Sequence, residues 1–253
     1  MQSLAAPSSR SKSPLPAIGL TLAASAALLG LVVALHLGGG IPIADLIRDP
    51  AAITQTPPYT GLLSQVGLFL WAATAAICLF CAGVASRDPA DAAMASFFRA
   101  SAALTLMLGL DDAFLLHEDL LPRIGIPEKG VLLAYAVLTA LYLLGFLRTI
   151  LARTGYELLA MALFFFAASV VLDVLNPPSI PYLAEDAAKI AGIVSWLAYF
   201  SRTAAGTLRM DITAPQPGQA RHSTARTTGG LAGGTVAFKS GKAPLPSSRR
   251  EGD

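Results

Sequence analysis

Five ionisable side chains interrupt an otherwise apolar stretch between residues 104 and 122. They are Asp111, Asp112, His117, Glu118 and Asp119. A charged side chain near the centre of a bilayer costs from about 2.5 to more than about 10 kcal/mol, depending on the method of measurement. Carboxylates and imidazoles can bind a metal cation, hold a proton or form an ion pair. This stretch is therefore the first candidate for a functional site.

Three more acids and one lysine lie in apolar segments later in the chain. Asp173 stands near the end of one apolar run, and Glu185, Asp186 and Lys189 stand at the start of the next. A short link joins the two runs, so we expect them to form antiparallel neighbouring helices that bring Asp173 close to Glu185 or Asp186. Glu185 precedes Lys189 by four residues, an order that favours pairing along one helix face.

The combined charges require neutralisation. Carboxylates that share a region of low dielectric with a single lysine repel one another and cannot all remain ionised and unpaired. A bound divalent metal ion, protonation, or contact with water would each relieve the repulsion, and the choice stays open. The predicted metal ligands are Asp111, Asp112, His117, Glu118, Asp173, Glu185 and Asp186. The predicted counter-ion is Lys189, which would pair with Asp111 or Asp112.

Helix geometry separates His117 from the acids. At 100° per residue, Asp111 and Glu118 fall within about 20° of each other on a helix. His117 falls on nearly the opposite side, so it joins the acids only if the helix bends or ends near residue 116. If the helix instead continues to Leu121, Asp111 lies about 15 Å below its outer end, near the bilayer midplane.

The composition predicts which elements carry these residues. The chain of 253 residues is 54% hydrophobic and only 13% charged, whereas a soluble domain is about 25% charged. Several apolar runs are long enough to cross about 30 Å of hydrocarbon as helices. We predict an all-α membrane protein, a bundle of about six transmembrane helices. The predicted spans cover residues 17–37, 61–85, 97–121, 129–147, 156–175 and 183–200.

The domain organisation follows from these spans. Residues 1–16 are rich in Ser and Pro, and we predict a disordered N-terminal tail. Residues 17–202 form the predicted transmembrane domain. Residues 203–253 contain Gly, Pro, Ser and basic residues without apolar periodicity, and we predict a disordered basic C-terminal tail.

The distribution of charge predicts an orientation. A net charge of only +2 gives no indication of a nucleic-acid partner. With six spans both termini share one side, which would carry 14 Lys and Arg residues against three on the other side. The positive-inside rule then places both termini in the cytoplasm of a multi-pass protein, which we assign to a bacterial inner membrane. In that orientation the intramembrane acids lie in the outer half.

Three functions fit these observations. The leading hypothesis is an acidic intramembrane site that binds or relays a cation or protons. The first alternative is a membrane-embedded, metal-dependent hydrolase of lipid amides or esters, in which His117 and carboxylates hold the metal. The second alternative is a non-catalytic subunit of a membrane complex. The lipid bilayer is the predicted partner, a homo-oligomer or a larger complex is compatible with the sequence, and the substrate is not indicated.

Overall fold

The computed structural model describes residues 15–175 and 182–213. The predicted disordered tails, residues 1–16 and 203–253, lie mostly outside these ranges and stay predictions there. The parts of the two predicted tails that the structure describes are helical. The first helix begins at Leu15, and the last helix continues to Thr213. The last helix therefore extends well past residue 200, where the sequence predicted its end.

All elements among the described residues are helical, and these residues include no strand. The elements are α1 (Leu15–Gly39), α2 (Ile43–Ile47), α3 (Pro50–Thr54), α4 (Leu62–Ala85), the 3-10 helix η1 (Pro89–Asp91), α5 (Ala92–Phe114), the π-helix η2 (Leu116–Leu120), α6 (Leu121–Arg123), α7 (Glu128–Arg153), α8 (Glu157–Leu175) and α9 (Tyr182–Thr213).

The chain divides into two compact units, residues 1–69 and residues 70–253. The first unit contains α1 and the short helices α2 and α3. The Nδ1 atom of His36 lies 2.8 Å from the carbonyl oxygen of Ile41 and ties the end of α1 to the following turn. The Asp49 carboxylate caps α3 by accepting hydrogen bonds from the backbone N–H groups of Ala51 and Ala52. Capping satisfies donors that a helix start leaves free.

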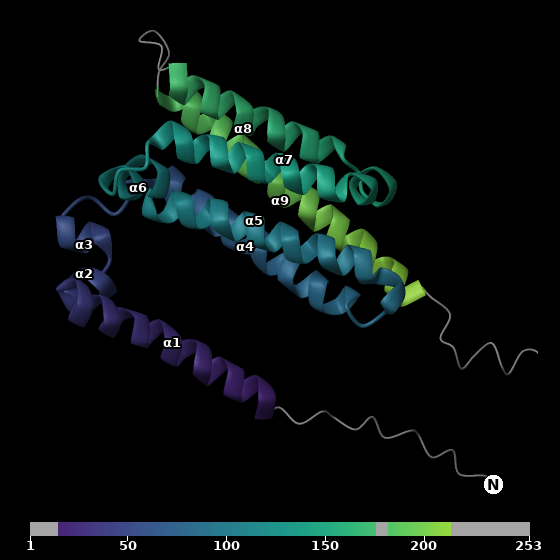
Figure 1. The fold of residues 1–253 in the computed structure, drawn as a ribbon, viewed down its shortest axis with the longest axis horizontal. Helices are drawn as coiled ribbons and strands as arrows, with labels where there is room; N and C mark the ends of the chain where they lie inside the picture. Colours follow the sequence, from purple (N-terminus) through teal and green to yellow (C-terminus); the bar gives the residue numbers. More distant parts are fainter. Residues whose placement is uncertain (1–14, 176–181, 214–253) are drawn as a thin grey trace, which may run out of the picture. The chain divides into compact units, whose positions relative to one another are not determined.

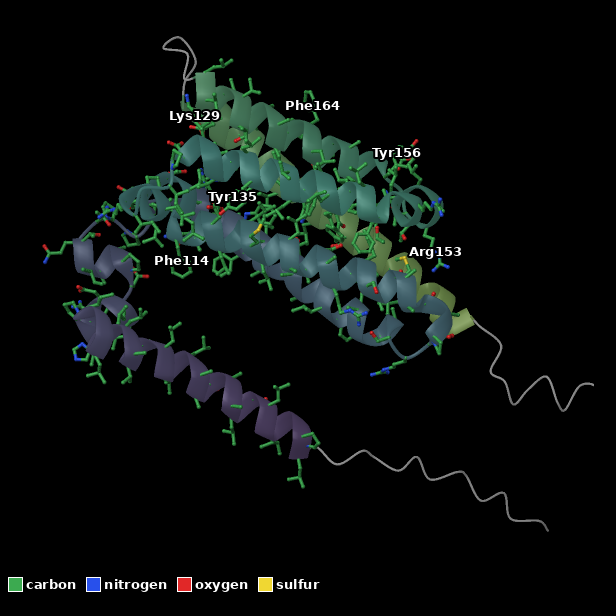
Figure 2. The ribbon with its side chains drawn as sticks, in the orientation of Figure 1. Phe114, Lys129, Tyr135, Arg153, Tyr156 and Phe164 are labelled. Carbon is green, nitrogen blue, oxygen red and sulfur yellow. The ribbon has the colours of Figure 1, made fainter. Side chains whose placement is uncertain are left out.

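The second unit is a helical bundle of α5, α7, α8, α9 and the part of α4 that follows Phe69. These long helices run side by side (Figure 1). We call the end at which α5 stops and α7 begins the His117 end. The opposite end, at which α7 stops, is the Arg153 end, and Figure 2 shows Lys129 and Arg153 at the two ends of α7.

An aromatic core fills the bundle toward the Arg153 end. Phe97 of α5 packs against Tyr142 of α7 and Phe200 of α9, with ring centroids 6.1 and 6.0 Å apart. Trp196 and Phe200 of α9 meet edge to face at 5.0 Å. Large buried rings of this kind supply much of the packing energy of a core, so this end of the bundle is where the helices are held together.

Five of the described helices are long and apolar enough to cross a membrane. They cover Ile18–Gly39, Leu62–Ala85, Pro89–Phe114, Glu128–Arg153 and Glu157–Leu175. Apolar helices of this number and length indicate a multi-pass membrane protein. The predicted sixth span, α9, is not among the five, and its sequence includes Glu185, Asp186 and Lys189.

Candidate functional site

The site begins where α5 ends. The sequence predicted one helix to Leu121, but α5 stops at Phe114, and Leu115 adopts a left-handed conformation with φ +50°. This conformation costs a residue with a Cβ about 1–2 kcal/mol. The chain then continues as one π-helical turn, η2. Asp111 therefore lies three residues, about 4.5 Å along the axis, from the last residue of α5, and not 15 Å from the helix end.

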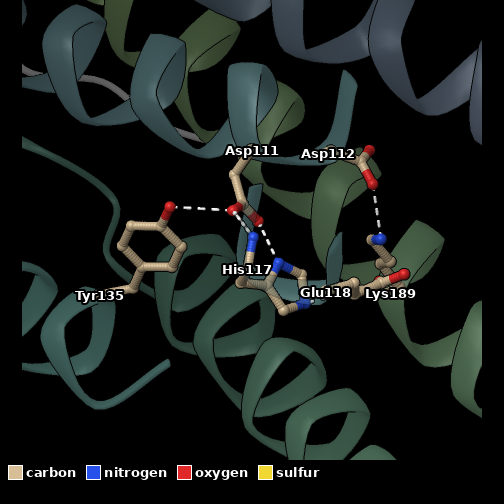
Figure 3. Close-up of polar contacts among 6 residues, drawn as sticks. All are labelled: Asp111, Asp112, His117, Glu118, Tyr135 and Lys189. Carbon is tan, nitrogen blue, oxygen red and sulfur yellow. Dashed lines mark hydrogen bonds and ion pairs between the residues drawn. The ribbon is translucent and has the colours of Figure 1, made fainter. Parts of the chain in front are cut away.

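The break brings His117 back onto Asp111. The Asp111 carboxylate accepts hydrogen bonds from the His117 backbone N–H at 3.0 Å and from the His117 ring at Nδ1 at 2.5 Å. Tyr135 of α7 donates its hydroxyl to the same carboxylate at 2.8 Å. Asp111 is only 6% exposed. Figure 3 shows both rings turned toward this one carboxylate. Three donors stabilise a buried anion that would otherwise be costly.

The contact with Asp111 orients the imidazole of His117. The Asp111 carboxylate accepts a hydrogen bond from the Nδ1–H group, so the other ring nitrogen, Nε2, is the one that can take up or release a second proton. Nε2 lies 3.5 Å from Glu118 Oε1. His117 lies beyond the apolar segment that ends at Phe114. The hydrogen bond with Asp111 raises the pKa of His117 above its ordinary value, while burial acts in the opposite direction.

A second acid is paired separately. The Asp112 carboxylate, with its side chain 7% exposed, lies 2.5 Å from Nζ of Lys189 on α9. The sequence had named Asp111 or Asp112 as the partner of Lys189, and the structure pairs it with Asp112 (Figure 3). The two adjacent aspartates therefore differ: Asp111 accepts hydrogen bonds from a histidine and a tyrosine, and Asp112 forms an ion pair with a lysine.

The remaining predicted acids lie at the margin of this site. The negative charges of Asp173, Asp186 and Glu118 act on Glu185. The approach of Asp173 to Glu185 or Asp186 across the link between α8 and α9 stays a prediction. Asp119 faces the solvent and pairs with Arg123 at 2.8 Å. Within the described residues, no three His, Cys, Asp or Glu side chains are grouped so that they could hold a metal ion.

The comparisons with known proteins give a family but no activity. The model of a family described as a domain of unknown function (DUF8692) matches residues 18–203, well over half of the chain. The chain belongs to this family. No curated protein and no solved structure matches it. The DUF8692 match includes every element that contributes to the site, from α5 to the first half of α9.

Sequence reasoning missed Tyr135 in this DUF8692 protein. It is a single tyrosine in the apolar helix α7, and its hydroxyl contacts a residue 24 positions earlier in the chain. A tyrosine within a predicted span is usually a sign of packing or of the membrane interface. The observation that could have singled it out is its place close to the start of α7, at the end of the bundle where α5 carries its acids.

Proposed function

We propose that this protein is a six-span integral membrane protein that binds and relays protons through the Asp111–His117 pair. The observation that supports the proposal is the single carboxylate shared by the His117 ring, the His117 backbone and Tyr135. This arrangement fixes the ring and leaves one nitrogen available for a proton near neutral pH. Intramembrane acids paired with histidine are typical of proton relays.

The proposed topology uses α9 as the sixth span. α9 presents a buried face to the other helices, with Ile193, Trp196 and Phe200 each no more than 1% exposed. A helix shielded by its neighbours needs less apolar surface than one that faces lipid on all sides. Both termini then lie on the cytoplasmic side of an inner membrane by the positive-inside rule, and the His117 end opens outward.

Protons suit the site better than a metal cation because the deep oxygens are already in use. Asp111 accepts three donors, and Asp112 is neutralised by Lys189. A cation that used both aspartates would have to displace these partners. A proton requires no displacement: it binds at Nε2 of His117, and the Asp111 carboxylate stabilises the resulting imidazolium across the bond at Nδ1.

Each group then has a defined part in the relay. A proton from outer water reaches Nε2 of His117 beside Glu118, whose side chain is about half exposed. Asp111 holds the ring in place and balances its charge. Tyr135 fixes the carboxylate from α7. The Asp112–Lys189 pair keeps the neighbouring negative charge from competing for the same proton.

A hydrolase is the second candidate, because a histidine that a carboxylate orients can also act as a general base. In that function Nε2 would take a proton from a water molecule that attacks a lipid ester or amide. This candidate predicts turnover of a fluorescent lipid ester that His117→Gln abolishes, without any movement of protons across the membrane.

The proton relay is tested in sealed liposomes. The purified protein is reconstituted into phosphatidylethanolamine–phosphatidylglycerol vesicles that contain a pH-sensitive dye, with potassium and valinomycin to clamp the membrane potential. After an external acid step, wild type should acidify the lumen faster than empty vesicles, and His117→Gln should abolish the difference. His36→Gln, the same change in α1, is the matched control and should behave as wild type. Equal rates for wild type and His117→Gln would overturn the proposal.

A further inference from the structure

The local sequence does not require the break in α5. Residues 111–121 contain no glycine or proline, and alanine, leucine and glutamate, which favour helices, make up much of the segment. Leu115 nevertheless adopts φ +50° and ψ +45°, and a π-helical turn follows it. Contacts with other groups must therefore hold the break. Strained residues and π-helical turns are both concentrated at functional sites.

Asp111 supplies the contacts that hold the break. In a regular helix the His117 N–H group would donate to the carbonyl oxygen of Ala113, four residues earlier. In the structure it donates instead to Oδ1 of Asp111, and the His117 ring bonds to Oδ2 of the same carboxylate. A continuous α5 would exchange one hydrogen bond of the His117 N–H group for another, lose the ring contact and restore the ordinary conformation of Leu115. The lost contact and the relieved strain are similar in size, so the two forms are close in free energy.

The two forms place His117 on different sides of α5. On a continuous helix, His117 falls within about 20° of Leu110 and one turn beyond Phe114. Leu110 is 49% exposed and Phe114 is 64% exposed, so this stripe faces away from the bundle, whereas Asp111 is only 6% exposed. A continuous α5 would therefore withdraw the imidazole from the buried carboxylate and place it about 9 Å from Asp111 along the helix axis.

The chain is long enough for this change. Asp112 is bound to Lys189 of α9, which anchors α5 directly before the break. A helix continued to Leu121 would rise about 10 Å beyond the present end of α5. The six residues 122–127, which precede α7, can span about 20 Å when extended. They can therefore return the chain to the start of α7 while the rest of the bundle stays in place.

We propose that Leu115 is a hinge at which α5 alternates between the broken form seen in the structure and a continuous helix to Leu121. The broken form holds His117 on Asp111, and the continuous form separates them. The inference rests on the proton relay proposed above for its purpose. Because that relay runs through the Asp111–His117 pair, it operates only in the broken form, and the hinge acts as its switch.

Two substitutions at Leu115 should shift the hinge in opposite directions. A β-branched residue is strongly disfavoured at positive φ, so Leu115→Ile should favour the continuous helix. Glycine adopts positive φ without a steric cost, so Leu115→Gly should favour the broken form. We expect each change to shift the ratio of the two forms by about 5- to 30-fold, the effect of the strain at this position.

The proton on Nδ1 of His117 reports the broken form, because a hydrogen bond to a carboxylate moves the NMR signal of this proton far downfield. In nanodiscs with ¹⁵N-labelled histidine, the signal should weaken in Leu115→Ile and persist in Leu115→Gly. Leu110 provides the matched control, because it lies in the regular part of α5 and is 49% exposed, against 48% for Leu115. Leu110→Ile should leave the signal unchanged.

Proton entry in the liposome assay connects the hinge to the relay. Leu115→Ile should slow entry by the same factor by which it weakens the downfield signal, and Leu110→Ile should retain the wild-type rate. If the signal responds at Leu115 while wild type moves no protons, or while entry stays unchanged, the relay is overturned and the hinge stands.

The NMR signal alone decides whether the hinge exists. An unchanged downfield signal in Leu115→Ile overturns the hinge, whether or not protons move. A weaker signal in Leu115→Gly also overturns it, because that variant relieves the strain of the broken form. An equal loss of signal in Leu110→Ile has the same meaning, since the effect would then not belong to the break. Thermal unfolding in detergent shows that each variant is folded.

Discussion

The two ends of the bundle solve the problem of buried polar groups in different ways. At the Arg153 end, neutral hydroxyls pair within a packed aromatic core, for example Ser101 with Tyr142 beside Phe97. At the His117 end, the buried polar groups are ionisable and are paired one by one, Asp111 with His117 and Asp112 with Lys189. The packed aromatic core thus lies at the Arg153 end of the bundle, and the paired ionisable groups lie at the His117 end.

The largest loss of stability should come from the aromatic core. Trp196→Ala removes a ring that is 1% exposed and contacts Phe166 and Phe200. The cavity should lower the free energy of unfolding by about 3–5 kcal/mol. Unfolding in mixed micelles of increasing SDS content measures this change. Phe164→Ala is the control, because Phe164 is 67% exposed and its loss should cost less than about 1 kcal/mol. Equal effects would mean that this end is not the packed core.

Loss of the buried ion pair should have an intermediate effect. Lys189→Met leaves the Asp112 carboxylate without its partner, and Lys189 itself is about one-third exposed. We expect a loss of about 1–3 kcal/mol, below the range for a fully buried pair, since water screens part of the interaction. The double variant Asp112→Asn/Lys189→Met should recover part of that loss in the same SDS titration. A double variant as unstable as the sum of the two single variants would show that the pair is not coupled.

The Tyr135 hydroxyl should contribute less. Tyr135→Phe removes one of three donors to Asp111 and leaves the ring in place. We expect a loss of about 1 kcal/mol in the free energy of unfolding, the typical value for one hydrogen bond. Tyr59→Phe, at a tyrosine that is 72% exposed, is the matched control. If the two variants are equally stable, Asp111 does not depend on the donor from α7.

The smallest effect should come from the surface of the Arg153 end. Arg153 lies 3.5 Å from Asp91, with 44% of the arginine side chain and 34% of the aspartate side chain exposed. Solvated pairs of this kind contribute between 0 and about 1 kcal/mol. Arg153→Gln should therefore change the free energy of unfolding by less than about 0.5 kcal/mol at moderate salt. A loss as large as that of Lys189→Met would remove the distinction between the charges of the two ends.

The sequence predicted the helices better than it predicted the site. Long apolar runs identified the main helices because a helix satisfies its backbone hydrogen bonds within one segment, as lipid requires. The break at Leu115 carried no signal, since a leucine rarely adopts a left-handed conformation and no glycine or proline marks the turn. A regular helix places His117 opposite the acids. The sequence therefore predicted that His117 joins the acids only if the helix bends or ends near residue 116.

The residues that other helices contribute to the site could not be predicted from the sequence. Tyr135 meets Asp111 only through the packing of α7 against α5, which no local pattern specifies. The extension of α9 to Thr213 was missed for a related reason. Thr203, Ala204 and Thr207 are buried against the bundle, and this tertiary packing sustains a helix where composition predicted a tail.

NMR titration of the histidine ring tests whether the break at Leu115 places His117 against Asp111. The chain contains only three histidines, His36, His117 and His222, so selective ¹⁵N labelling in nanodiscs gives few signals to assign. A neighbouring anion favours the charged imidazolium, so the pKa of His117 should lie above about 6.5 in wild type and return toward that value in Asp111→Asn. The same pKa for His117 in both proteins would show that the Asp111 carboxylate does not contact the His117 ring.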